Sequence, residues 1–269
     1  MSHRRYLRAM RRSAILFSVL TASCTDPSSR PSASQADKKG PPSREVEKGP
    51  KNYDDARGLL AGLFKGPGKT WYCACRYDGR RKVDARACGL PTDLGAPERR
   101  GRVEWEHVVP AATFGKRLPA WDGAHPECER ARKRGRECLR MVSPAFNRME
   151  ADLYNLRPVV GSVNELRGSR AMSEIRGDDG VGRCDLEVHR GQVEPPDPVK
   201  GDVARIYLHM EARYPGRGIV DRRDRDAYLR WSREDPASSE ECALIRRIEA
   251  LMGYSSPVYG EACPVRASD

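Results

Sequence analysis

The stretch RVEWEHVVPAATFG, residues 102–115, places two carboxylates around a tryptophan and follows them with a histidine, two valines and a proline. Side chains of opposite character alternate over residues 103–108, which predicts a short strand that Pro110 closes. On a regular strand, Glu106 and His107 point to opposite faces. If both act at one site, the backbone is therefore expected to bend or bulge at the end of this strand.

The rest of the chain predicts more helix than sheet. Two segments begin with a serine suited to cap a helix, namely Ser143 before Pro144 and Ser238 three residues before Glu241. A second strand is predicted over residues 183–189. Apolar residues repeat at helical spacing in segments 143–156, 203–215 and 238–254. These patterns predict an α+β domain with little sheet.

Composition favours a polyanionic partner. The 269 residues carry 49 Lys and Arg against 38 Asp and Glu, a net charge of +11. A chain of this length forms one domain or at most two, and it can bury a sizeable core. The basic balance is typical of proteins that bind nucleic acid or an anionic membrane surface, although part of the charge can lie in solvated tails.

The N-terminus predicts export. Five arginines precede a short apolar run over residues 14–22, and small residues follow before Cys24, which is the order of a secretory signal. The apolar run is too short for a transmembrane helix. We expect residues 1–23 to be a signal peptide of lipoprotein type and Cys24 to be lipidated, with ordinary cleavage nearby as the alternative. Residues 24–51 are rich in Ser, Pro, Lys and Gly and are expected to form a flexible tether. Residues 52–269 then form one domain.

The cysteines fit an oxidising compartment. There are nine, and setting Cys24 aside leaves an even number. A zinc site at the first three of them is the rival, but the common C-x-x-C spacing is absent from the sequence. We therefore expect four disulfides, whose pairing the spacing leaves open. The eight cysteines are Cys73, Cys75, Cys88, Cys128, Cys138, Cys184, Cys242 and Cys263.

Beyond the opening stretch, the segment EADLYNLRPVVGSVNELRGSR, residues 150–170, brings an acid, amides and arginines close in sequence. With His107, these residue types suit a hydrated hard cation that acts on a phosphodiester. The structural alternative is that His107 is a surface histidine beside an acid.

Four segments together resemble the bacterial endonuclease I family, which comprises periplasmic and secreted non-specific nucleases. They are YCACRYDGRRKVDARACG, RVEWEHVVPAATFG, MEADLYNLRPVVGSVNELR and GYSSPVYGEAC, and the resemblance covers about residues 55–263. The resemblance implies an α+β fold with a ββα-metal (His-Me finger) core, additional helices and disulfides.

The resemblance also implies roles for particular residues. His107 would be the general base, and Glu106 and Asn155 would hold one divalent ion, Mg²⁺ first, with Mn²⁺ or Ca²⁺ as alternatives. Asn164 and Arg167 would support the site. Products would end in 5′-phosphate and 3′-hydroxyl groups. The residue types agree with these roles, because Mg²⁺ prefers oxygen ligands and keeps several waters, and because neutral imidazole has an ordinary pKa of about 6.5.

A basic segment over residues 127–140 is the candidate for contact with phosphates. It holds six basic residues against three acids and lies between two cysteines. A solvated loop is the alternative reading. Phosphate contacts carry no sequence information, which suits a non-specific nuclease. The candidates are Arg130, Lys133, Arg134 and Arg136.

These observations predict an exported, lipid-tethered, Mg²⁺-dependent endonuclease, monomeric, periplasmic or at the cell surface, that hydrolyses DNA and also RNA. One alternative is a catalytically inert secreted module that binds nucleic acid or another polyanion. Another is a phosphodiesterase of the same fold that acts on a different phosphate ester. Cleavage of plasmid DNA distinguishes the enzyme from the binding module.

Overall fold

The computed structural model describes residues 48–175, 177 and 180–264. The predicted signal peptide, Cys24 and the tether as far as residue 47 lie outside the described residues. Within the described ranges, no helix combines the length and the apolar character needed to cross a membrane.

The described chain begins with helix α1 (Tyr53–Leu63). Asn52 caps this helix, because its side chain accepts hydrogen bonds from the backbone N–H groups of Asp54 and Asp55. A small hairpin and a one-turn helix follow: β1 (Gly68–Lys69), β2 (Arg76–Tyr77) and α2 (Pro97–Arg100). The segment therefore leads from α1 to the start of the predicted strand.

The centre of the domain is the antiparallel pair β3 (Val103–His107) and β4 (Leu156–Val160), followed directly by helix α7 (Gly161–Arg167). The pairing keeps one register from Val103 opposite Val160 to His107 opposite Leu156, so β3 contains no bulge, and the chain bends directly after it, at Val108 and Val109. The strand simply ends at His107. Four short helices and two 3-10 turns connect the two strands: α3 (Ala111–Gly115), a 3-10 turn (Pro119–Asp122), α4 (Pro126–Ala131), α5 (Gly135–Val142), α6 (Pro144–Glu150) and a second 3-10 turn (Leu153–Asn155).

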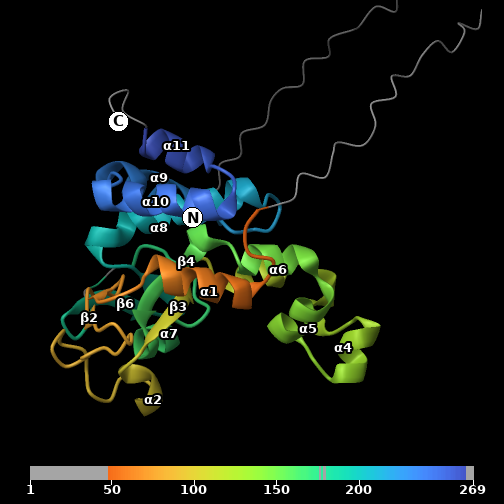
Figure 1. Cartoon of the computed structure of the whole chain (residues 1–269), viewed down its shortest axis with the longest axis horizontal. Coiled ribbons are helices and arrows are strands. Elements are labelled where there is room, and N and C mark those ends of the chain that lie inside the picture. Colours follow the sequence, from red (N-terminus) through yellow and green to blue (C-terminus); the bar gives the residue numbers. More distant parts are fainter. Residues whose placement is uncertain (1–47, 176, 178–179, 265–269) are drawn as a thin grey trace, which may run out of the picture. The chain divides into compact units, whose positions relative to one another are not determined.

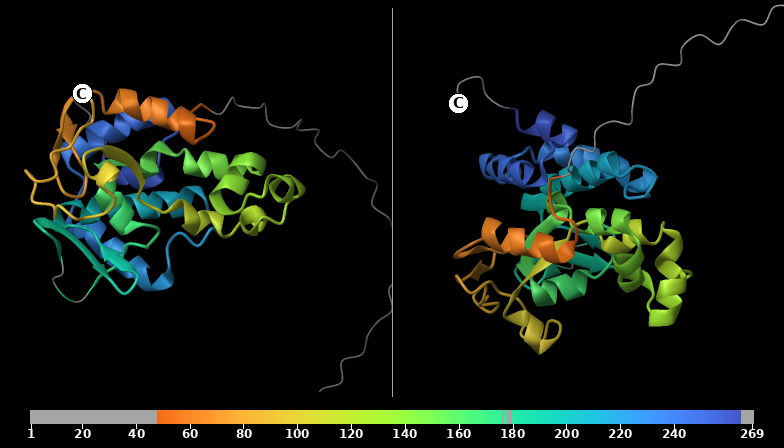
Figure 2. Two further views of the ribbon diagram at one scale, coloured as in Figure 1. Left: turned by 90° about the horizontal axis from the view of Figure 1, so that it is seen from below. Right: turned by 45° about the vertical axis from the view of Figure 1, so that its right-hand side comes forward.

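A second helical group forms the C-terminal part. Figures 1 and 2 show α8 to α11 gathered on one side of the β3–β4 pair, while α4 and α5 extend from another side. A three-stranded sheet precedes this group, with β6 in the middle. The elements are β5 (Gly180–Val181), β6 (Cys184–His189), β7 (Gln192–Glu194), α8 (Lys200–Arg213), α9 (Arg222–Glu234), α10 (Ser239–Met252) and α11 (Pro257–Ala262).

The predicted elements are present, with one boundary shifted. Helix α10 has the predicted cap, because the Glu241 backbone N–H donates to the Ser238 hydroxyl at 3.0 Å. Helix α6 begins after Ser143 as predicted but ends at Glu150, and Leu153–Asn155 forms a separate 3-10 turn. The turn begins where the Asp152 carboxylate accepts a hydrogen bond from the Tyr154 backbone N–H. An α+β fold with three small sheets is therefore confirmed.

All eight cysteines of the domain form disulfides, as predicted. The pairs are Cys73–Cys184, Cys75–Cys88, Cys128–Cys138 and Cys242–Cys263. The first joins segments 111 residues apart, and the third closes the basic loop between α4 and α5. The alternative of a zinc site at Cys73, Cys75 and Cys88 is thereby excluded, because all three form disulfides.

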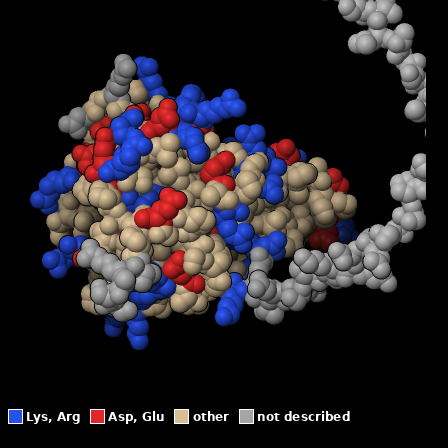
Figure 3. All heavy atoms as spheres, turned by 90° about the horizontal axis from the view of Figure 1, so that it is seen from above, with Lys and Arg blue, Asp and Glu red and all other residues tan. Residues whose placement is uncertain are grey.

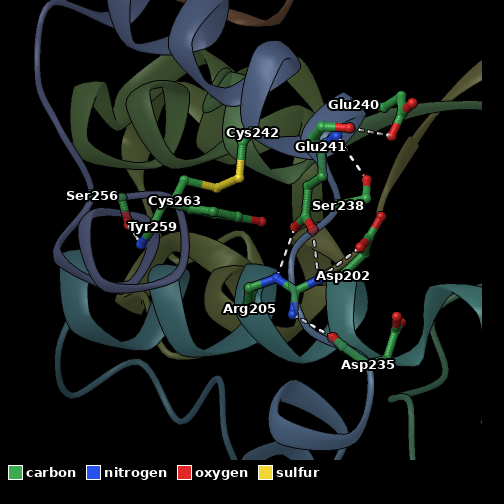
Figure 4. Close-up of a disulfide and its surroundings, with 11 residues drawn as sticks. Asp202, Arg205, Asp235, Ser238, Glu240, Glu241, Cys242, Ser256, Tyr259 and Cys263 are labelled. Atoms are coloured by element: carbon green, nitrogen blue, oxygen red, sulfur yellow. Dashed lines mark hydrogen bonds and ion pairs between the residues drawn. A yellow bond between two sulfur atoms is a disulfide. The ribbon is translucent and has the colours of Figure 1, made fainter. Parts of the chain in front are cut away.

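The last disulfide lies beside a buried ionic cluster in the helical group (Figure 4). Arg205 of α8 is 1% exposed and donates to both carboxylate oxygens of Glu241, at 2.9 and 2.6 Å. It also donates to Asp202 at 2.8 Å and to the backbone carbonyl of Asp235 at 2.7 Å. A buried guanidinium with this many partners joins α8, the end of α9 and α10 into one layer.

Candidate active site

One cavity of about 910 Å³ lies over β3, the first turns of α1 and the C-terminal half of α7. Glu106 and His107 both line it. All five residues of β3 line this cavity, so side chains from both faces of the strand reach it. Of the bend or bulge expected at the end of the strand, the structure has a bend, at Val108 and Val109.

His107 is held in one tautomer by its neighbours. Its Nε2 lies 2.8 Å from the backbone carbonyl oxygen of Glu150, which can only accept a hydrogen bond. Nε2 therefore carries the proton, and Nδ1 carries a lone pair. The Arg136 Nη2 group lies 3.1 Å from Nδ1 and donates to it. The unprotonated nitrogen is thus the one that faces a cavity-lining arginine.

The imidazole is neutral across the physiological pH range. Burial, together with the positive charge of Arg136, lowers the pKa of His107 to about 3. His107 is 6% exposed, and the ring of Tyr53 lies 5.1 Å from its ring, centroid to centroid. A neutral, oriented imidazole can accept a proton at Nδ1 once Arg136 no longer donates to that nitrogen, and accepting a proton is the first requirement of a general base.

Glu106 forms a buried ion pair. One carboxylate oxygen, Oε1, lies 2.9 Å from Nη1 of Arg167 and accepts a hydrogen bond from the Tyr72 hydroxyl at 3.4 Å. Burial raises the pKa of Glu106 to about 7, and the charge of Arg167 opposes that rise. Both contacts use Oε1, which leaves Oε2 for the cavity that Glu106 lines.

Arg167 braces the end of β3. Its guanidinium donates to the backbone carbonyl of His107 at 2.7 Å and to that of Val108. The side chain is 1% exposed and is held on α7, so it connects the helix to the strand end. The predicted supporting position of Arg167 agrees with these contacts.

Asn164 of α7 lines the same cavity. Its amide nitrogen donates to Oε2 of Glu104 at 2.9 Å. Glu104 lies two residues before Glu106 on β3, and Arg99 and Arg102 donate to its carboxylate. The β3–β4–α7 unit therefore presents a carboxylate, an amide and an imidazole to one space.

Asn155 lies elsewhere, contrary to the expected position of a metal ligand. Its side chain is 0% exposed and is absent from the cavity lining. The amide oxygen accepts from the Val109 backbone N–H at 2.7 Å, and the amide nitrogen donates to the Val109 carbonyl at 2.9 Å. Both amide atoms are used by the backbone that follows β3, so Asn155 secures this segment rather than facing the cavity.

The four basic candidates separate in the structure. Arg136 lines the cavity and also pairs with Glu150, which Arg140 contacts at 2.7 Å. Lys133 pairs instead with Glu137 at 3.0 Å, and Lys133 and Arg134 line a second cavity beside the Cys128–Cys138 loop. Arg130 is exposed on α4 and lines neither cavity. The structure therefore brings only Arg136 of this group to His107.

One face of the domain carries charges of both signs. On the side shown in Figure 3, Lys and Arg side chains are interspersed with Asp and Glu. Local arginines at the cavity, rather than the overall charge, are the groups placed to meet an anion.

The oxygen donors at the cavity suit a hard divalent ion. Among the described residues, no three His, Cys, Asp or Glu side chains are grouped as a metal site. Glu106 offers one carboxylate oxygen and Asn164 one amide oxygen, and both residues line a cavity wide enough for bound water. Mg²⁺ commonly keeps several waters and binds through one or two protein oxygens. The residues present therefore fit such an ion.

Three functional neighbours were not identified from the sequence. Glu104, Glu150 and Tyr53 contact the groups around His107 or line the same cavity. The spacing of Glu104 and Glu106 on one strand was a usable signal, because residues two apart share a face. The contacts of Glu150 and Tyr53 with His107 join distant segments and had no comparable signal.

Comparison with known proteins identifies relatives over most of the domain. The family model described as Endonuclease I matches residues 75–263. An extracellular deoxyribonuclease of Aeromonas hydrophila is 36% identical over 209 residues, which cover 75% of this chain and 84% of that protein. A periplasmic deoxyribonuclease of the same species is 34% identical over 213 residues, 76% of this chain and 83% of that protein. Endonuclease-1 of Buchnera aphidicola subsp. Acyrthosiphon pisum is 27% identical over 219 residues, which cover 79% of this chain and 82% of that protein. The chain therefore belongs to the Endonuclease I family and is a nuclease.

Proposed function

We propose that this protein is an exported, divalent-metal-dependent nuclease that hydrolyses DNA without sequence preference. The observation that carries the proposal is the state of His107: its Nε2–H donates to the Glu150 carbonyl, so Nδ1 is left with a lone pair in a cavity lined by Glu106 and Asn164. The relatives named as extracellular and periplasmic deoxyribonucleases support DNA as the substrate and export as the destination. Four disulfides are in keeping with an oxidising compartment.

His107 is the proposed general base. Nδ1 takes a proton from the attacking water, and the Glu150 carbonyl keeps the ring in the required orientation. The pKa of about 3 describes the site with the Arg136 charge beside the ring. A phosphate group that draws Arg136 away removes this charge and adds a negative one, so both changes raise the basicity of His107.

Glu106 and Asn164 are the proposed ligands of one divalent ion, Mg²⁺ first. A bound ion there supplies positive charge to the scissile phosphate and to the leaving 3′ oxygen. Asn164 takes the role expected for Asn155, because Asn164 lines the cavity while the Asn155 amide is bonded at both ends to Val109. On this proposal β3, β4 and α7 form the ββα-metal core.

Arg136 is the proposed phosphate contact at the cavity. Its side chain is 40% exposed and lies between His107 and Glu150, so it can turn outward to an incoming anion. The part of the α4–α5 segment that precedes Arg136 carries three more basic residues, Arg130, Lys133 and Arg134. We propose that they contact the backbone phosphates of a longer substrate. Phosphate contacts of this kind give affinity without sequence preference. We propose that RNA is also cleaved, and that products carry 5′-phosphate and 3′-hydroxyl ends.

Cleavage of supercoiled plasmid tests the proposal. The disulfide-bonded domain from Asn52 onward is incubated with plasmid in Mg²⁺ or in EDTA, beside His107→Ala and the matched control His189→Ala. His189 is exposed at the end of β6 and does not line the cavity. Nicking that needs the ion, survives in the control and disappears in His107→Ala supports the proposal. A gel shift without cleavage in any divalent ion would instead favour a binding module.

A further inference from the structure

Glu104 is the most heavily bonded carboxylate at the cavity, yet the proposed chemistry does not use it. Arg102 donates to its Oε1 through Nε at 2.9 Å and through Nη2 at 2.6 Å. Arg99 donates to the same oxygen through Nε at 3.0 Å and to Oε2 through Nη2 at 2.5 Å. Oε2 also accepts the amide nitrogen of Asn164 at 2.9 Å.

This arrangement keeps Glu104 ionised. The guanidinium groups of Arg99 and Arg102 donate four hydrogen bonds to its two oxygens and the Asn164 amide donates one, so every contact of this carboxylate uses it as an acceptor. Two guanidinium groups compensate one carboxylate, and its side chain is 16% exposed. Glu104 therefore has little residual charge to attract a cation, but it remains a strong acceptor for the Asn164 amide.

The fold brings α7 close to this carboxylate. Gly161 begins α7, and a Cβ at that position would lie 2.5 Å from the Arg99 carbonyl oxygen and 2.9 Å from Oε1 of Glu104. The Gly161 backbone N–H donates to the Arg102 carbonyl at 3.0 Å. Glycine thus permits the close approach that places Asn164, less than one turn later, beside Glu104.

We infer that Glu104 is a positioning residue that orients the Asn164 amide for the metal site, an inference that rests on the proposed function of that site. A carboxylate can only accept, so it selects the amide nitrogen of Asn164 and turns the amide oxygen away from itself. The oxygen then faces the cavity as a ligand. Without this contact the two ends of the amide are nearly equal in shape, and the nitrogen end cannot bind a cation.

The variant Glu104→Gln changes this selection without changing size. Three of the five donated hydrogen bonds go to Oε1, so the glutamine oxygen is expected at that position and its NH₂ group at the position of Oε2. An NH₂ group there faces the Asn164 amide as a donor. Asn164 must then turn its oxygen toward Gln and its nitrogen toward the cavity, which removes the ligand.

The same reasoning predicts a rescue. In the double variant Glu104→Gln with Asn164→Asp, one Asp oxygen accepts from the Gln NH₂ group and the other faces the cavity. In Asn164→Asp alone, two carboxylates meet at the 2.9 Å contact and repel each other. Asn164→Asp should therefore weaken metal binding when residue 104 is Glu and restore it when residue 104 is Gln.

Titration calorimetry with Mn²⁺ on the disulfide-bonded protein, without nucleic acid, tests this inference. We expect Glu104→Gln to weaken Mn²⁺ binding about 10- to 100-fold, the range typical of residues that orient a metal ligand. Glu165→Gln is the matched control: Glu165 is next to Asn164 and lies 3.7 Å from Arg99, but it does not line the cavity. Circular dichroism and thermal unfolding establish that each variant is folded.

The outcomes separate the inference from the proposed function. Weakened binding in Glu104→Gln, unchanged binding in Glu165→Gln and recovery in the double variant support the orienting role. Binding in Glu104→Gln as tight as in the wild type would overturn it, and so would a double variant no better than Glu104→Gln. Wild-type protein that neither binds Mn²⁺ nor needs a divalent ion for cleavage would instead overturn the proposed metal site itself.

Discussion

Asn155 and Asn164 should respond in opposite ways to substitution by alanine. Asn155 is fully buried, and its amide joins both backbone polar groups of Val109, which is itself 0% exposed. Asn164 is half-buried and makes one side-chain contact, to Glu104. The first residue should therefore govern stability, and the second should govern metal affinity.

The magnitudes follow from the groups left without partners. In Asn155→Ala, the Val109 N–H and C=O each lose a buried partner at about 1–3 kcal/mol, so the free energy of unfolding should fall by about 2–6 kcal/mol. In Asn164→Ala, one contact to a partly solvated carboxylate is lost, and the decrease should be about 1–2 kcal/mol. Mn²⁺ affinity should fall at least about tenfold in Asn164→Ala, because a direct ligand is removed.

Urea unfolding with the disulfides intact, followed by tryptophan fluorescence in EDTA, gives the two free energies. Calorimetry with Mn²⁺, at a temperature where each variant is folded, gives the affinities. If Asn155→Ala were as stable as the wild type and had lost Mn²⁺ binding, Asn155 would be the ligand and our assignment of Asn164 would be refuted.

Three further results are expected. Arg136→Ala should reduce the rate of DNA cleavage and the salt dependence of DNA binding, because its guanidinium contacts the substrate. Its Mn²⁺ affinity should stay within about twofold of the wild type, because Arg136 does not contact the ion. Cleavage kinetics, DNA-binding titrations in increasing salt and Mn²⁺ calorimetry measure these three quantities. Replacing Cys242 and Cys263 by serine should lower the free energy of unfolding by about 3 kcal/mol, as expected for a loop closed across 21 residues, measured by urea unfolding. Asp152→Asn should destabilise the protein most above about pH 4 and progressively less in acid. Burial raises the pKa of Asp152, but His209 and the Tyr254 and Tyr214 hydroxyls lower it more, so its stabilisation is present above the ordinary pKa and lost as the pH falls through the lower folded value. Thermal unfolding from pH 2 to 7 should show the two proteins converge; a constant difference would contradict this assignment.

Local sequence predicted much of the secondary structure. The strand predicted over residues 103–108 (observed at Val103–His107), the caps at Ser143 and Ser238 and the disulfide count all follow from residues close together in the chain or from their total number. Helix α6 was predicted too long, because apolar spacing continued to Leu153 while the Asp152 carboxylate started a new turn. Side-chain competition for backbone N–H groups ended the helix before its apolar pattern ended.

The candidate site was predicted in part. Glu106, His107 and Arg167 meet at the cavity, since strand β3 and helix α7 follow one another through the β3–β4 pair. Asn155 and Asn164 could not be distinguished by sequence, because both are amides in the same short segment. Which one faces the cavity depends on the pairing of His107 with Leu156, which places Asn155 beside the backbone just after β3.

The sequence by itself therefore determined the class of fold and the number of disulfides, and it singled out His107 as the candidate base, because these depend on residue type and local spacing. Tertiary structure decided the disulfide partners, the tautomer of His107 and the asparagine that faces the cavity. It also brought Arg99, Glu104 and Asn164 together from three separate elements. The contact between Asn164 and Glu104 joins residues 60 apart in the chain, and the packing of α7 against α2 and β3 determines that these side chains meet.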